Sequence, residues 1–381
     1  MQLQFGIDVL MQRPGEYKHL RIALVTNDAA TTCTGELSRV ALWKNDFNVC
    51  KLFSPEHGIG AAGEDGAFQN NSIDAVTGLP VISLYSNKLA TNEEDLENID
   101  VVMFDTPDVG CRFYTYLWTM TYVMEACAKF QKPFLLLDRP NPIGADLAKA
   151  EGPILDEENC SSFIGRWSIP VKHCCTLGEL ALYFAATKIN GLRIDVIKVE
   201  NYQRQQTAID FLFAPTSPAI KDAATAMLYP GTGLLEGVNV NEGRGTSTPF
   251  RICGATWIQA QDLQDALQQR LSGVIVKPVH YKPVRGWYAN EHCNGVELLL
   301  ADTHKFFAVQ TGITLLQTLQ QLYPQQLKER IYKTNANPTG KKHLDKLLGV
   351  KNAFMQLQNG NNFATDVKEE WKNTMKDFLL Y

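Results

Sequence analysis

The sequence predicts an α/β protein, with a Rossmann-like, doubly wound parallel sheet in an N-terminal domain and a smaller α+β C-terminal domain. Over the first half, short apolar runs alternate with longer mixed segments, a pattern typical of parallel strands buried beneath helices. Beyond about residue 201, glycine-rich loops interrupt this alternation. The length of 381 residues also exceeds what one hydrophobic core ordinarily serves. We therefore place the two domains at residues 1–200 and 201–381.

Six apolar runs of the first domain predict the strands of its sheet. They are rich in Val, Leu, Ile and Phe, and several end in a polar residue. In chain order they cover residues 21–27, 48–53, 81–85, 101–105, 134–138 and 195–199. Helices are predicted over residues 115–130 and 177–187, the second with Thr176 as its N-cap and Glu179 near its start.

The second domain combines helix-like and strand-like segments in an α+β pattern. The predicted helices cover residues 259–271 and 312–322, and the predicted strands between them cover residues 274–281 and 295–301. The tail from residue 367 to residue 381 has apolar residues at helical spacing, namely Trp371, Met375 and Phe378. We expect this tail to pack against the body of the protein.

Composition and charge exclude several classes of function. Hydrophobic residues make up 45% and charged residues 20%, as in a folded globular protein. The net charge is −5 and no Lys/Arg run forms a phosphate-binding stripe, so we expect no nucleic-acid partner. No apolar stretch is long enough for a signal peptide or a bilayer span. We expect a cytoplasmic protein with no membrane partner, or an exported, periplasmic one if a signal peptide has been removed. Its oligomeric state is not indicated.

The sequence gives no indication of a metal or cofactor. The nine cysteines include no CxxC pair, so we expect reduced, mostly apolar side chains. The His, Asp and Glu residues lack a regular metal-ligand spacing such as HExxH. Residues 58–63 match the G-x-G-x-x-G fingerprint, but Pro55, Glu56 and His57 separate them from the preceding strand and a loop follows them. A nicotinamide cofactor is therefore not expected.

The residues able to carry chemistry stand just after the predicted strands. In open parallel sheets, ligands bind beyond the carboxyl ends of the strands, so we expect these side chains to converge on one rim. Glu56 and His57 follow the second strand. His173 follows a short strand that ends near Val171. Other polar side chains end or follow the remaining strands: Asn27, Asp105, Asp108, Arg112, Asp138, Arg139 and Asn141.

Most of these side chains also have a structural interpretation. The alternatives are turn formation for Asp138, helix capping for Asp105 and Asp108, and hydrogen bonding within the scaffold for His57 and His173. Glu56 differs because its position between Pro55 and His57, after a buried strand, is unsuitable for a surface salt bridge. Burial there would raise the pKa of Glu56 and suit it to donate a proton near neutral pH.

A polar, glycine-rich loop covers residues 234–246 in the second half. It contains Asn239, Glu242 and Arg244 among flexible glycines. Two interpretations are open: a polar wall for a substrate, or a long structured loop held by these same side chains. The Gly-Arg-Gly setting of Arg244 suits it to bind a carboxylate through two parallel hydrogen bonds.

Several long motifs resemble those of the YbbC-like family, which includes the NamZ-type exo-β-N-acetylmuramidases of bacterial cell-wall recycling. The motifs lie at residues 53–58, 108–116, 137–142, 229–232 and 235–246. The resemblance covers nearly the whole chain. It implies a Rossmann-like domain, a smaller C-terminal domain and an active cleft between them. It also implies release of N-acetylmuramic acid from the non-reducing end of peptidoglycan fragments.

The chemistry of glycoside cleavage gives these residues provisional roles. An acid protonates the leaving oxygen, and a second carboxylate or the acetamido group of the substrate acts on the other side of the sugar. Glu56 is the expected acid, with Asp105, Asp108 and Glu242 as candidates for the second group. The lactyl carboxylate of muramic acid requires a cation, for which the candidates are Arg112, Arg139 and Arg244. The other expected substrate-binding residues are Asn27, His57, Tyr114, Tyr116, Asp138, Asn141, His173 and Asn239.

The chain departs from the family pattern beside several of these motifs. The substituted positions are Pro107, Cys174, Cys175, Ala219 and Arg251. Amide side chains usual in the family are lost at Pro107 and Ala219, whereas the acids are retained. This combination favours an altered substrate over an inactive site. The alternative is a non-catalytic muropeptide- or sugar-binding paralogue with the same fold.

Overall fold

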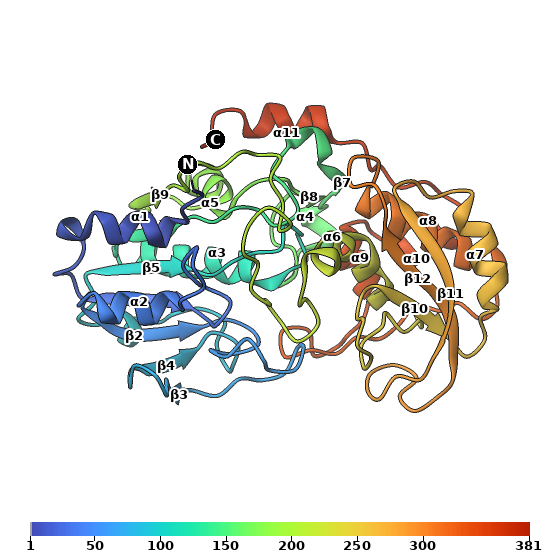
Figure 1. The fold of residues 1–381 in the computed structure, drawn as a ribbon, viewed down its shortest axis with the longest axis horizontal. Helices are drawn as coiled ribbons and strands as arrows, with labels where there is room; N and C mark the ends of the chain where they lie inside the picture. Colours follow the sequence, from blue (N-terminus) through green and yellow to red (C-terminus); the bar gives the residue numbers. More distant parts are fainter. Residues whose placement is uncertain (1) are drawn as a thin grey trace.

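A computed structural model describes residues 2–381 and contains a seven-stranded sheet that is parallel except at one edge (Figure 1). Its strand order is β3-β4-β2-β1-β5-β6-β9, and only the β3–β4 pair is antiparallel. The strands are β1 (Ile22–Thr26), β2 (Val49–Ser54), β3 (Ser72–Ile73), β4 (Pro80–Ser83), β5 (Val101–Asp105), β6 (Phe134–Leu137) and β9 (Ile194–Ile197). The six predicted strands are confirmed, and the short edge strand β3 was not predicted.

Helices cover both faces of this sheet, as expected for a doubly wound fold. Alternate residues of β1 enter two different hydrophobic clusters. Ile22 and Leu24 pack towards α1 (Gly6–Gln12) and α2 (Ser38–Lys44). The opposite face, with Ala23 and Val25, packs against α3 and α5, which cover Thr115–Lys129 and Leu177–Thr187. Because every residue of β1 is buried, its sequence is a continuous apolar run.

The strand order reverses direction at β1, which pairs with β2 on one side and β5 on the other. Such a switch point opens a crevice at the carboxyl ends of the strands. The helix expected after Thr176 is also present: the Thr176 hydroxyl accepts a hydrogen bond from the Glu179 amide at 3.2 Å, and the Glu179 carboxylate accepts one from the Thr176 amide at 3.1 Å.

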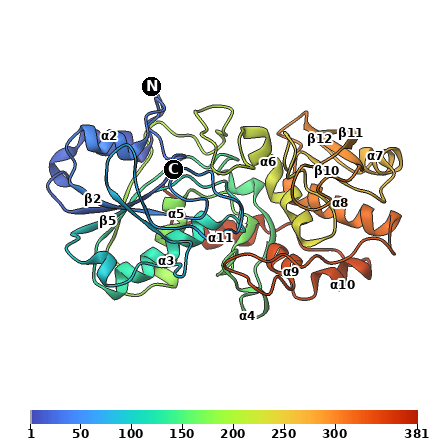
Figure 2. The ribbon, with the colours of Figure 1, turned by 90° about the horizontal axis from the view of Figure 1, so that it is seen from below.

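The second half forms a smaller α+β unit around a three-stranded antiparallel sheet, β10-β12-β11. Figure 2 shows this unit at the opposite end of the molecule from the larger sheet. Its elements are α6 (Ala223–Thr232), β10 (Ile252–Ala255), α7 (Ala260–Gln268), β11 (Val274–Tyr281), β12 (Cys293–Leu300), α8 (Ala308–Leu322), α9 (His343–Leu348) and α10 (Ala353–Gln358). The four segments predicted here are present, and α8 begins four residues earlier than expected.

The last helix, α11 (Lys368–Met375), returns to the first half of the chain. Trp371 and Met375 are buried in the same cluster as α3 and α5, and the Trp371 indole donates a hydrogen bond to the His173 carbonyl at 2.7 Å. The tail therefore packs as predicted, against the domain with the larger sheet. Within residues 2–381, no helix combines the length and apolarity needed to cross a membrane.

Candidate active site

Two adjoining cavities lie where the loop after β2 meets segments of the second half. The first has a volume of about 620 Å³ and is lined by Glu56 and several aromatic side chains. The second has a volume of about 910 Å³ and is lined by Glu242 and Arg244. His57, Asp65 and Tyr332 line both cavities, so the two form one continuous site.

Glu56 follows β2 and is buried, with 4% of its surface exposed. One carboxylate oxygen accepts a hydrogen bond from the backbone amide of Gly66 at 2.7 Å. Burial raises the pKa of Glu56 above its ordinary value and outweighs the opposite effect of the neighbouring His57. The burial and the direction of this shift are those expected from the sequence, and they favour a carboxyl group that is protonated before it reacts.

Gly66 fits this position because its φ is +66° and because a Cβ there would lie 2.7 Å from a side-chain atom of Thr334. The segment around Thr334 comes from the second half of the chain. It is held by the Asn335 amide, which donates to the Gly66 carbonyl at 2.8 Å, and by the Asn335 side chain, which donates to the Ser86 carbonyl at 2.9 Å. The second half therefore closes directly over the loop that holds Glu56.

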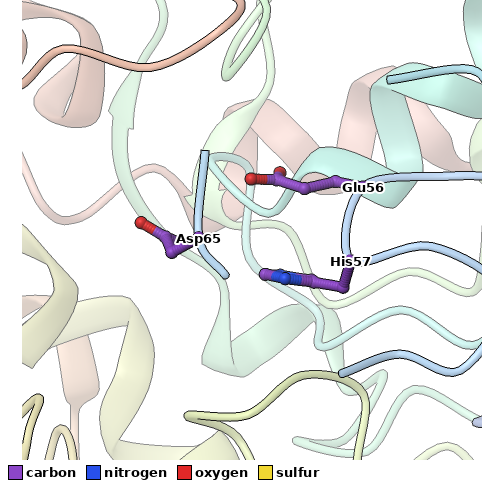
Figure 3. Close-up of side chains that lie close together, drawn as sticks. All are labelled: Glu56, His57 and Asp65. Carbon is purple, nitrogen blue, oxygen red and sulfur yellow. The ribbon is translucent and has the colours of Figure 1, made fainter. Parts of the chain in front are cut away.

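Glu56 and His57 point in the same direction, towards Asp65 (Figure 3). One carboxylate oxygen of Glu56, one of Asp65 and a ring nitrogen of His57 lie within 4.8 Å of one another. His57 has a φ of +68°, a left-handed conformation that is strained for a residue with a side chain. Its Nδ1 lies 2.8 Å from the Gly63 carbonyl and so carries a hydrogen, which fixes the orientation of the ring.

Asp65 has the opposite environment to Glu56. Arg244 lies 2.9 Å from one of its oxygens, the Tyr332 hydroxyl donates a hydrogen bond to it, and 34% of its side chain is exposed. Burial opposes ionisation of Asp65, but Arg244 and His57 outweigh it, so its pKa lies below the ordinary value. Two neighbouring carboxyl groups with pKa values shifted apart are a typical acid and carboxylate pair.

The spacing of Glu56, His57 and Asp65 would also allow them to share a metal ion. Their other contacts do not favour this chemistry. The Arg244 guanidinium already neutralises Asp65, and a cation placed beside it would be repelled. This set of groups fits proton transfer better than metal binding.

Arg244 joins Asp65 to two further carboxylates, Glu236 on the wall of the first cavity and Glu242 on the wall of the second. It pairs with Glu236 and, at 3.0 Å, with Glu242, which also pairs with Arg330 at 3.2 Å. Burial raises the pKa of Glu236 to about 7, although Arg244 opposes this shift. Glu242 and Arg244 thus lie at the site, as predicted, but they form an ion pair with each other. Glu242 is 1% exposed and fixes Arg244, which in turn keeps Asp65 ionised.

Asp105 and Asp108 are not brought to Glu56, contrary to the expectation that one of them acts with it. Asp105 is fully buried and binds Arg139 at 2.6 and 3.0 Å, so each neutralises the other. Asp108 accepts a hydrogen bond from the Gly110 amide at 2.7 Å and lies 3.5 Å from His173. None of these four side chains lines either cavity.

The prediction that Arg112 binds the substrate carboxylate is also wrong. Arg112 is fully buried and donates hydrogen bonds to the carbonyls of Pro153, Ile169 and Leu347 at 2.7, 2.8 and 2.9 Å. Burial lowers its pKa to about 10. Its hydrogen bonds join three distant segments of the chain, and the side chain lines neither cavity, so it does not reach a ligand there.

Several other predicted binding residues form the scaffold. Asp138 caps α5 by accepting hydrogen bonds from Thr176, Gly178 and Tyr381 at 2.7, 2.9 and 2.8 Å. His173 follows β8 (Pro170–Lys172), which pairs with β7 (Glu151–Ile154) outside the large sheet, so it does not reach the expected rim. The side chains of the remaining amides bond to nearby backbone: Asn27 to Ala29, Asn141 to Cys175 and Ile143, and Asn239 to Gln326 and Lys328.

The two predicted tyrosines differ in position. Tyr114 lines the first cavity, whereas Tyr116 lies behind it with its ring 6.3 Å from that of His57. Both hydroxyls donate to the Thr216 carbonyl, at 3.1 and 2.7 Å respectively. Tyr116 therefore supports His57 and the cavity wall without reaching the cavity.

Comparison with known proteins agrees with this architecture. The family "Exo-beta-N-acetylmuramidase NamZ, N-terminal" matches residues 22–224, and the corresponding C-terminal family matches residues 227–380. The peptidoglycan beta-N-acetylmuramidase NamZ of Bacillus subtilis (strain 168) is 36% identical over 391 residues, covering 100% of this chain and 92% of that protein. The chain belongs to the NamZ family. The resemblance read from the sequence motifs is confirmed.

Two solved structures of DUF1343 family proteins from Bacteroides fragilis NCTC 9343 share the fold of this NamZ family member. They superpose with TM-scores of 0.88 and 0.75, each at 28% identity and covering 100% of this chain and 99% of the other. The predicted fold class is therefore confirmed, with a mostly parallel seven-stranded sheet and a smaller region with an antiparallel sheet.

Most of the positions expected to depart from the family pattern lie away from the two cavities. Ala219 lines the second cavity. Pro107 lies in a separate hollow beside Asp108, and Cys174 and Cys175 are buried in the core. Arg251 lies within 4.0 Å of Asp222 and Glu297 on another face. Only Ala219 is thus positioned to alter contacts with a ligand in these cavities.

Several cavity residues were not predicted from the sequence. They are Asp65, Tyr85, Tyr332, His343 and Lys346, whereas Glu236 belongs to the polar loop at residues 234–246 that was considered as a substrate wall. The acidic pair at residues 64 and 65, shortly after Glu56, was the available signal for Asp65, because a loop that follows a strand end lies at the same rim. The residues beyond 330 come from irregular segments and a short helix, for which periodicity gives no signal.

Proposed function

We propose that this chain is an exo-acting β-N-acetylmuramidase, a glycosidase that releases N-acetylmuramic acid from the non-reducing end of peptidoglycan fragments. The observation that carries the proposal is the pair of carboxyl groups within 4.8 Å, Glu56 with a raised pKa and Asp65 with a lowered one. Membership of the NamZ family and the name of the Bacillus subtilis relative support the same substrate class.

Glu56 acts as the general acid. Its proton moves to the glycosidic oxygen as the bond from that oxygen to the anomeric carbon breaks. Asp65 is the carboxylate that faces the positive charge developing on the sugar ring. Its pairing with Arg244 keeps Asp65 ionised while Glu56 is protonated. Water then adds at the anomeric carbon and returns a proton to Glu56, which restores the starting state.

The separation of the two groups favours retention of anomeric configuration. Inverting glycosidases hold their carboxyl groups about 6.5–9.5 Å apart, which leaves room for a water molecule, and retaining enzymes hold them about 5–5.5 Å apart. The nearest oxygens of Glu56 and Asp65 lie within 4.8 Å, a shorter gap than the inverting arrangement needs for its water molecule. Retention follows whether Asp65 attacks the anomeric carbon or positions the acetamido group of the substrate to do so.

The two cavities suit removal of one terminal sugar. The first contains Glu56 and aromatic rings such as Tyr85, Phe113 and Tyr229, which suit the face of a single sugar. The second reaches solvent-exposed groups, including Arg285 with 56% of its side chain exposed, and would hold the leaving part of the substrate. Both predicted domains line the site, so we propose that residues 201–381 close a cleft carried by residues 1–200.

Hydrolysis of 4-nitrophenyl N-acetyl-β-muramide tests this function. The wild type is expected to release nitrophenol, and Glu56→Gln to lose about 10²- to 10⁴-fold in kcat, the usual contribution of a general acid. Glu97→Gln, which changes an exposed glutamate of the first domain, is the matched control and should retain full activity. Binding of the muramide without turnover by the wild type would instead support the sugar-binding paralogue.

A further inference from the structure

The cavity that holds Glu56 is also lined by three polar side chains from α9 and the loop before it: Asn337, His343 and Lys346. We propose that these three residues form the subsite for the lactyl carboxylate of the terminal muramic acid, with Lys346 as its cation. This inference rests on the proposed function and assigns the group that distinguishes muramic acid from other N-acetylated hexosamines.

The charges around the two cavities favour Lys346 over the arginines. Arg244 is paired with three carboxylates, and Arg330 is paired with Glu242. Arg285 lines only the second cavity, away from Glu56, and 56% of its side chain is exposed. Over residues 2–381, Lys346 has no carboxylate oxygen within 4.0 Å, and its ammonium donates to the neutral Oδ1 of Asn337 at 2.8 Å. Lys346 therefore keeps a net positive charge on the cavity wall, where an anionic substituent would be attracted.

Asn337 offers an unused donor beside this cation. Because Lys346 can only donate, the side-chain oxygen of Asn337 must face it, which directs Nδ2 elsewhere. That Nδ2 is buried and has no hydrogen-bond partner among the described residues. A buried amide donor without a partner is unfavourable, and an acceptor on a ligand would satisfy it.

His343 adds a second unused polar group. It is 4% exposed, and within the described chain neither ring nitrogen has a hydrogen-bond partner. Its ring stacks on that of Tyr332, with centroids 4.6 Å apart and an angle of 13° between the planes. Tyr332 in turn donates to Asp65, so the subsite is joined through one rigid side chain to the catalytic carboxylate.

Together, these groups match a carboxylate better than the neutral substituents of the sugar. The ammonium of Lys346, the amide of Asn337 and the one N–H of a neutral His343 are all donors. A carboxylate has two acceptor oxygens and a full negative charge, whereas an acetamido group offers one neutral carbonyl. Hydrogen bonds between charged groups are also stronger than neutral ones.

Calorimetric titration with two free sugars tests the subsite independently of turnover. N-acetylmuramic acid carries the lactyl carboxylate, and N-acetylglucosamine lacks it. The wild type should bind N-acetylmuramic acid more tightly, and Lys346→Met should weaken that binding by about 10- to 100-fold, the range for one charge-assisted hydrogen bond. Binding of N-acetylglucosamine should stay the same. Lys346→Arg should restore part of the preference, and Lys351→Met, which changes an exposed lysine beyond α9, should leave it unchanged.

The outcomes separate the subsite from the activity. If the wild type cleaves the muramide but Lys346→Met keeps the full preference for N-acetylmuramic acid, the subsite is wrong and the function stands. If the wild type cleaves no muramide but its preference for N-acetylmuramic acid depends on Lys346, the subsite stands and the function is wrong. If the wild type shows no preference for N-acetylmuramic acid over N-acetylglucosamine, the subsite is overturned.

Discussion

Replacing Arg244 by Met tests how the site keeps two adjacent carboxyl groups in different protonation states. Arg244 lies 2.9 Å from Asp65, and Met fills a similar volume without the charge. Because Asp65 must be ionised to face a cationic transition state, loss of Arg244 should raise the pKa of Asp65. The acid limb of the pH profile should then move to higher pH.

The size of this shift follows from the charges and their exposure. Two unit charges about 4 Å apart interact by roughly 4 kcal/mol at an effective dielectric constant of about 20, and by about 1 kcal/mol in bulk water. At about 1.36 kcal/mol per pKa unit, these limits correspond to shifts of about 3 and about 0.7 units. Since 34% of the Asp65 side chain is exposed, we expect a value in the lower part of this range, about one unit.

The assay is the pH dependence of kcat/KM for the chromogenic muramide, which reports the ionisations of the free enzyme. Arg13→Met is the control, since it removes one exposed positive charge 3.5 Å from Glu200 and away from both cavities. Circular dichroism establishes that both variants are folded. An acid limb that stays in place while the rate falls by a constant factor would refute the account of Asp65.

Two further predictions concern the scaffold and the stereochemistry. Arg112→Met removes the guanidinium donor from the buried carbonyls of Pro153 and Leu347, at about 1–3 kcal/mol each, whereas the Ile169 carbonyl still accepts from the Leu155 amide at 3.3 Å. The free energy of unfolding should therefore fall by about 2 kcal/mol or more in urea titrations, while folded enzyme keeps its KM. A selective rise in KM at unchanged stability would instead show that Arg112 contacts the substrate. Proton NMR of the first product should show the β-anomer of N-acetylmuramic acid, and initial formation of the α-anomer would contradict the arrangement of Glu56 and Asp65.

The central strands of the large sheet, β1, β5 and β6, could be predicted because burial on both faces makes each one a largely apolar run. β1 is an example, since all five of its residues are buried. The edge strand β3 could not, because both of its residues are exposed and leave no apolar signal. The helix after Thr176 was predictable from its capping residues, whose mutual hydrogen bonds depend only on local sequence.

The site was predictable only in part, for a physical reason. A strand end places Glu56 at the rim of the sheet whatever the rest of the chain does. The same rule also selected Asp105 and Arg139, and it could not show that these two would neutralise each other at 2.6 Å. Sequence position predicts which residues lie at the rim of the sheet. Ion pairs between distant side chains decide which of these charged groups can still contact a ligand.

The rest of the site depends on contacts between segments that are distant in the sequence. Asp65 becomes a partner of Glu56 because Gly66 turns its amide towards that carboxylate and Thr334 packs against the turn. Lys346 reaches the same cavity from a helix about 290 positions away in the sequence. No local pattern encodes such contacts, which explains why the arginines near recognisable motifs were the only cations predicted.

The role of Glu56 as proton donor is tested most directly by the dependence of the Glu56→Gln defect on the leaving group. A 2,4-dinitrophenyl muramide has a leaving group that departs without protonation, whereas a sugar alcohol requires it. We predict a small loss of kcat/KM on the dinitrophenyl substrate and a loss of about 10²- to 10⁴-fold on a muramyl disaccharide. Equal losses on both substrates would contradict the assignment of Glu56 as the acid.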